Sequence, residues 1–166
     1  MAKLDQQRER KIKYHNSMEE ISALVKANTP IIWVVSHEEN RFQDDFINTV
    51  AKEKTYSIWT WTSFQGLLNA CTSDELPEYR ASGEHDKTWL PPTALDAINS
   101  MKKSPKETKD IKRTIYLLKD FNSVMVDPVI RQLKDLYHRL VEQNKILIIV
   151  SPTLAYGPVS SLKSGV

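Results

Sequence analysis

The sequence is poor in several residue types, and each shortage narrows the class of protein. Its 166 residues include one cysteine, Cys71, so the chain has neither an internal disulfide nor a cysteine-rich zinc site. No apolar stretch is long enough to cross a membrane, and none follows the basic N-terminus as a signal peptide would require. We therefore expect a cytoplasmic protein with no membrane contact.

Glycine is also scarce, and its distribution excludes one common type of site. The chain has four glycines, none of them between Met1 and Thr62. A glycine-rich loop that wraps phosphates after the first strand is therefore absent. Neither GxSxG nor GxGxxG occurs, and the four histidines lack the HxxxH or HxH spacing of a preformed metal site. We expect no metal site and no cofactor in this chain, and we expect that the chain alone is not an enzyme.

Four apolar runs of strand length alternate with amphipathic helical patterns. The runs cover residues 30–36, 56–62, 114–121 and 145–152, and the helical patterns cover residues 17–25, 38–52, 93–101 and 127–142. Such alternation predicts an α/β fold of three layers, with a parallel sheet of about four strands joined by right-handed crossovers. Thr93 and Asp127 are the expected N-caps of the last two helices. Residues 65–91 form a long irregular stretch, expected to be a mobile flap or a partner-binding loop.

Ligands of open parallel sheets bind at the carboxyl ends of the strands, so polar residues there are the candidates for chemistry. The first strand ends in SHEEN, residues 36–40, and the third in LLKDF, residues 117–121. Glu38 and Glu39 fit best as acids that complement a helix dipole, and Asp120 as a surface acid that ends a strand. The weaker alternative is a metal-dependent hydrolase that uses Glu38, Glu39 and Asp120, with His37 as a binding residue.

Basic residues gather in two segments. Residues 1–15 hold five basic and two acidic side chains, and residues 102–113 hold six and two. Exposed basic loops are usually only solvated, but they can also contact nucleic acid or an acidic protein. The binding candidates in the second segment are Lys102, Lys103, Lys112 and Arg113.

An ordered set of motifs resembles the N-terminal domain of AAA+ ATPases of the plastid and cyanobacterial hypothetical-ATPase type. The motifs are ANTPIIWVVSHEENR at 27–41, SIWTWT at 57–62, TALDAI at 93–98, LKDF at 118–121, DPVIRQLKDLYHRL at 127–140 and LIIVSPT at 147–153. The resemblance covers residues 17–152, and no single motif is diagnostic. The long stretch at 65–91 departs from the family pattern.

The resemblance implies a degenerate domain that precedes the AAA+ module of the family. This domain has the strand order of a P-loop nucleotide hydrolase but lacks the phosphate loop. In the family, the ATP- and magnesium-binding residues lie later in the polypeptide, and the full-length protein is an ATPase. We therefore expect a basic extension at 1–16, the degenerate domain at 17–153 and a tail or linker at 154–166. The leading hypothesis is a non-catalytic substrate-binding, regulatory or assembly domain, monomeric when isolated, whose partner is the C-terminal AAA+ module or another protein. The alternative is a stand-alone protein that binds nucleic acid or a protein through segments 1–15 and 102–113.

Overall fold

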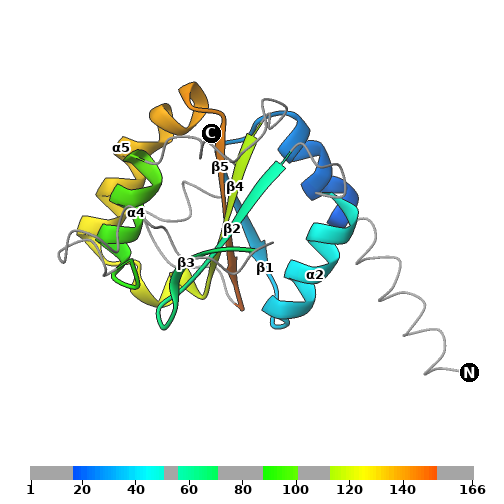
Figure 1. The fold of residues 1–166 in the computed structure, drawn as a ribbon, viewed down its shortest axis with the longest axis horizontal. Coiled ribbons are helices and arrows are strands. Elements are labelled where there is room, and N and C mark those ends of the chain that lie inside the picture. Colours follow the sequence, from blue (N-terminus) through cyan, green and yellow to red (C-terminus); the bar gives the residue numbers. More distant parts are fainter. Residues whose placement is uncertain (1–16, 51–55, 71–87, 101–112, 153–166) are drawn as a thin grey trace, which may run out of the picture.

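A computed structural model describes residues 17–50, 56–70, 88–100 and 113–152 of the chain. In this part of the protein, a twisted sheet lies between two layers of helices (Figure 1). A helix covers residues 17–26. The elements that follow it are β1 (Ile31–Val35), α2 (Glu39–Thr49), β2 (Tyr56–Thr62), β3 (Gly66–Asn69), α4 (Pro91–Ser100), β4 (Arg113–Lys119), the 3₁₀ helix η1 (Phe121–Val124), α5 (Asp127–Glu142) and β5 (Lys145–Ser151).

The sheet has the strand order β1-β5-β4-β2-β3. The pairs β1–β5, β5–β4 and β4–β2 are parallel, and only β3 runs antiparallel, beside β2. The predicted three-layer α/β fold is confirmed, and its mostly parallel sheet is consistent with a P-loop-like architecture. β5 lies between β1 and β4, so it ends between the carboxyl ends of these two strands.

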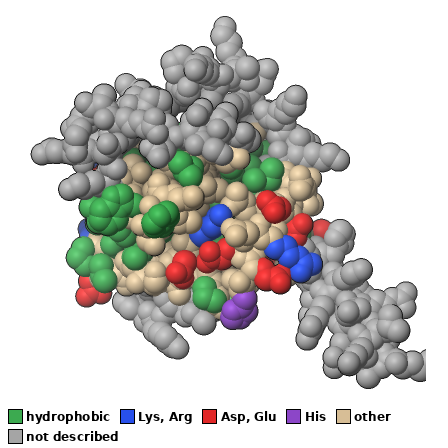
Figure 2. Space-filling model, turned by 60° about the horizontal axis from the view of Figure 1, so that its bottom comes forward, with side chains coloured by type: hydrophobic (Ala, Val, Ile, Leu, Met, Phe, Trp, Pro, Cys, Tyr) green, Lys and Arg blue, Asp and Glu red, His purple; other side chains and the backbone are tan. Residues whose placement is uncertain are grey.

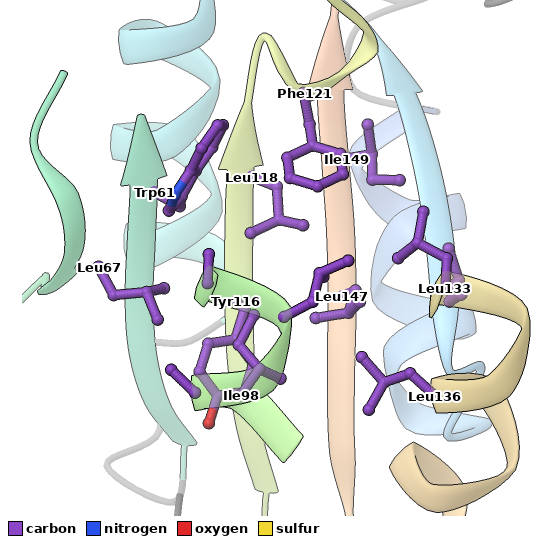
Figure 3. Packing of buried hydrophobic residues seen from close by; sticks show 14 of the residues in the cluster. Trp61, Leu67, Ile98, Tyr116, Leu118, Phe121, Leu133, Leu136, Leu147 and Ile149 are labelled. Carbon is purple, nitrogen blue, oxygen red and sulfur yellow. The ribbon is translucent and has the colours of Figure 1, made fainter. Parts of the chain in front are cut away.

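One hydrophobic core lies between the sheet and the helices α4 and α5. Figure 3 shows strand residues that face Ile98 of α4 and Leu133 and Leu136 of α5. The strand residues labelled there are Trp61, Leu67, Tyr116, Leu118, Leu147 and Ile149. Trp61 of β2 also meets Phe121 edge-on, with 5.0 Å between ring centroids, which fixes η1 against the end of the sheet.

A second core lies on the opposite face of the sheet. The helix of residues 17–26 contributes Met18, Ile21 and Val25, and α2 contributes Phe42 and Phe46. The side chains of β2 alternate between the two cores, because Ile58 belongs to this one while Trp59 and Trp61 belong to the first. The central strands are thus buried on both faces, as expected of continuous apolar runs.

The prediction for residues 65–91 was wrong at both ends of the stretch. Gly66 begins β3, a four-residue edge strand too short to show a period, and residues 71–87 lie outside the part that the structure describes. Helix α4 begins at Pro91, two residues before the predicted cap Thr93. Proline suits the first turn of a helix because a backbone N–H in that turn would have no acceptor within the helix.

Two other predicted boundaries also moved. Val126 rather than Asp127 is the N-cap of α5, so Asp127 lies in the first turn, where its charge complements the helix dipole. The strand predicted at 114–121 ends at Lys119, because Asp120 adopts the left-handed conformation, with φ of 54°, and turns the chain into η1. No helix among the described residues is long and apolar enough to cross a membrane.

Candidate functional site

The carboxyl edge of the sheet brings together the ends of β1, β5 and β4. The Ser36 N–H donates to the Ser151 carbonyl at 2.8 Å, and the Asp120 N–H donates to the Val150 carbonyl at 2.8 Å. The sequence-predicted residues His37, Glu38 and Asp120 therefore lie at one edge of the molecule. Figure 2 shows this end, where acidic, basic and histidine side chains lie beside hydrophobic ones.

The connection from β1 to α2 consists of residues 36–38, and its backbone is already engaged. The Glu38 N–H donates to the Ser36 hydroxyl at 3.2 Å, and the Glu38 carbonyl accepts from the Phe42 N–H at 2.9 Å as α2 begins. The Glu38 carboxylate accepts from Arg41 at 2.9 Å, an exposed pair that contributes at most about 1 kcal/mol. The Glu38 side chain therefore faces its own helix rather than a shared site.

Glu39, Asp120 and Lys119 form the charged centre of this edge. Partial burial raises the pKa of Glu39, and the nearby Asp120 carboxylate raises it further, while Lys119 opposes the change. Burial likewise lowers the pKa of Lys119, against the attraction of Glu39 and Asp44. The Lys119 ammonium donates to the Asn40 side-chain carbonyl at 3.2 Å. Of the three acids that the sequence offered as candidates, Glu39 and Asp120 thus lie near each other, and Lys119 beside them was not among the predicted residues.

The edge also contains a partly buried hydrogen bond that the sequence did not indicate. The Trp33 indole N–H donates to the Ser151 hydroxyl at 2.7 Å. Ser151 is fully buried, and it joins β5 to the neighbouring strand β1 through this bond. The only sequence signal is a serine that ends a buried strand, a position that a cap or a ligand-binding residue can equally occupy.

The predicted binding residues do not converge. His37 is exposed at the carboxyl edge, whereas Arg113 is the first residue of β4 and thus lies about 20 Å away along the strand. Arg113 donates to the carbonyls of Val25 and Lys26, at the end of the first helix, so its charge satisfies a helix C-terminus. Lys102, Lys103 and Lys112 lie outside the described residues.

The predicted residues form no metal site in the described part of the chain, and they do not line the groove found there. In the described ranges, no three side chains of His, Cys, Asp or Glu are grouped as a metal site would require. A groove of about 420 Å³ runs between the first helix and α2, where Met18, Ser22, Lys26, Asp45 and Thr49 are among its lining residues. This groove contains none of the sequence-predicted candidates.

Comparisons with known proteins give the family. One relative is a diatom protein from Trieres chinensis described as the uncharacterized AAA domain-containing protein ycf46, which is 26% identical over 133 residues. That match covers 80% of this chain but only 23% of the relative, so the chain spans about a quarter of that protein. No solved structure matches the chain significantly. The family described as the SpoVK-like AAA ATPase, N-terminal domain, matches residues 17–163, and the chain therefore belongs to that family.

Proposed function

We propose that this chain is a non-catalytic N-terminal domain of an AAA ATPase, with a substrate-binding, regulatory or assembly role, and that the ATP-binding module lies outside it. The observation that carries the proposal is the connection between β1 and α2. A P-loop-like sheet would hold its phosphate loop there, but this connection has three residues, 36–38, and no glycine.

The backbone and charge of this connection do not suit a phosphate. A phosphate loop binds through several free N–H groups, whereas the N–H groups of Ser36 and Glu38 donate within the protein. Glu38 and Glu39 place two carboxylates at the N-terminus of α2, where the helix dipole would otherwise attract an anion. An approaching phosphate would meet repulsion in place of hydrogen-bond donors.

The acidic residues of the edge likewise do not suit a magnesium–nucleotide complex. Asp120 directly follows β4, where a magnesium-associated aspartate would stand in a P-loop enzyme, but Lys119 places an ammonium beside Glu39 and Asn40. The Lys119 ammonium attracts the Glu39 carboxylate and would repel a divalent metal ion at the same place. The arrangement therefore supports a scaffold that binds a partner rather than one that turns over ATP.

A calorimetric titration of the isolated chain with Mg-ATP tests the proposal. We expect no saturable heat up to about 1 mM nucleotide, which corresponds to binding weaker than about 4 kcal/mol. The Asp120→Asn variant is the matched control, because it removes the acid that a magnesium ion would need and nearly preserves its shape. A micromolar Kd in the parent chain that is lost in Asp120→Asn would contradict the proposal.

A further inference from the structure

Exposed large hydrophobic side chains gather at the carboxyl edge. Five are found in the described ranges, and four of these lie at this edge: Phe64, Val126, Val35 and Trp89, with 92%, 58%, 51% and 46% of their surface exposed. We call these four residues the carboxyl-edge patch. The fifth, Val141, lies at the other end of the molecule, in the last turn of α5.

The fold places the four residues of the patch from separate segments. Val35 ends β1, Phe64 lies in the turn between β2 and β3, and Val126 precedes α5. Trp89 is placed beside the β2–β3 turn, because its backbone nitrogen lies 2.9 Å from where a Cβ on Gly66 would be. The four side chains are spread along the edge from β1 to the β2–β3 turn rather than forming one continuous apolar area, so a partner that covered all of them would also cover the polar residues between them.

The chain also leaves the described domain at this edge. β5 lies between β1 and β4 and ends at Ser151, and Pro152 follows it at the carboxyl edge. The polypeptide therefore continues toward any C-terminal module from this edge, through residues 153–166, which lie outside the described ranges. Tethering of that kind gives an effective concentration in the millimolar range, so even a modest surface would remain occupied.

Among the described residues around the patch, acidic side chains outnumber basic ones. The charged residues of the strand ends and the helix N-termini here are Glu38, Glu39, Asp120, Asp127, Arg41 and Lys119. Interfaces of this kind combine an apolar centre with a polar rim, and opposite charges across the rim guide the encounter. The surface thus fits a partner face with apolar side chains bordered by lysine or arginine.

We propose that the carboxyl-edge patch is the docking surface for the AAA module of the same polypeptide. This inference rests on the proposed function, since it requires that such a module follows the domain. The edge where a P-loop enzyme would bind nucleotide then holds a neighbouring domain instead. The proposed contact is therefore confined to one end of the sheet and does not include the two helical layers.

Hydrogen–deuterium exchange of the full-length protein, compared with the 166-residue chain, tests the docking. We expect amides of residues 36–40, 62–66 and 120–126 to exchange about tenfold more slowly in the full-length protein, if the module binds with a Kd of about 0.1 mM at a tethered concentration of about 1 mM. Protection confined to the helix of residues 17–26 and α2, or equal exchange in both proteins, would overturn the inference.

Two exposed positions provide variants that spare the core. Phe64→Ser and Val126→Asp in the full-length protein should abolish the protection, and Val141→Asp, the same chemistry at the opposite end, should leave it unchanged. Urea unfolding of Phe64→Ser should match that of the parent, whereas Val126→Asp, which places a favoured capping residue at the N-cap of α5, should be at least as stable as the parent. Protection that survives both patch variants would refute the docking surface. Nucleotide binding by the isolated chain would instead refute the proposed function, so the two failures are distinguishable.

Discussion

Gly66 at the start of β3 provides a sharp test of the described geometry. Its φ of +72° lies in the left-handed region, which costs an alanine about 1–2 kcal/mol. A Cβ at this position would also lie 2.4 Å from the Thr88 hydroxyl oxygen and 2.9 Å from the Trp89 nitrogen. Gly66→Ala therefore forces both neighbours to move as well as straining the turn.

The movement would disturb two hydrogen bonds that tie the segment before α4 to the sheet. The Thr88 hydroxyl accepts from the Leu67 N–H at 3.1 Å, and the Thr88 carbonyl accepts from the Trp61 indole at 2.6 Å. Each bond contributes about 1 kcal/mol. With the backbone strain, Gly66→Ala should lower the free energy of unfolding by about 3–4 kcal/mol.

Urea unfolding followed by tryptophan fluorescence measures this loss, because the chain has four tryptophans. Thr88→Ala in the Gly66→Ala background removes the closest clashing atom, so the double variant should lose less than the sum of the single changes. A Gly66→Ala loss below about 0.5 kcal/mol, within the range of an ordinary surface substitution, would refute the geometry of the turn.

Two further predictions concern buried polar groups. Ser151→Ala leaves the Trp33 indole N–H without its acceptor and should lower the free energy of unfolding by urea by about 1–3 kcal/mol. The control Ser123→Ala, at an exposed serine, should lower it by less than about 0.5 kcal/mol. Equal losses in the two variants would contradict the role of Ser151. Burial lowers the pKa of Lys145 from its ordinary 10.5 to about 8 in the folded chain. Between these two pH values the unfolded chain binds more protons than the folded chain, so the free energy of unfolding rises with pH. The free energy of unfolding of the parent, minus that of Lys145→Met, should accordingly rise from pH 7 to pH 10 in urea titrations. A difference that falls over this range would show that burial does not lower the pKa of Lys145.

The sequence predicted the layers of the fold well because the apolar runs are long and their periods are distinct. The runs around Leu117 and Ile148 are buried on both faces, so no polar residue interrupts them. β3 could not be predicted in the same way. Four residues at a sheet edge carry too little pattern, and the pairing of Trp61 with Leu67 depends on the turn between them.

The candidate site was predicted in part. The strand ends placed Glu39 and Asp120 at one edge, because the carboxyl ends of parallel strands meet there. Lys119 was not singled out, since its importance comes from the proximity of α2, which only the three-dimensional packing reveals. Arg113 was assigned to a basic binding segment, although its side chain reaches the end of the first helix. That contact joins residues almost ninety positions apart, beyond any local pattern.

The role of the remaining basic residues stays a prediction. Residues 1–15 and Lys102, Lys103 and Lys112 lie outside the described part of the chain. Nucleic-acid binding through these segments would weaken steeply with salt, because phosphate contacts release counterions. A gel-shift titration at 50 mM and 200 mM salt would therefore reveal such binding, and no shift at the lower concentration would remove the nucleic-acid version of the alternative.

The central claim is that the carboxyl edge of this domain does not bind nucleotide. Amide NMR of the isolated chain, titrated with Mg-ATP to about 5 mM, tests it residue by residue, since that concentration would populate a site with a Kd of about 1 mM by more than three quarters. The account predicts no saturable shift for the amides of Ser36, Glu38 and Asp120. Saturable shifts at these amides, lost in Asp120→Asn, would contradict it.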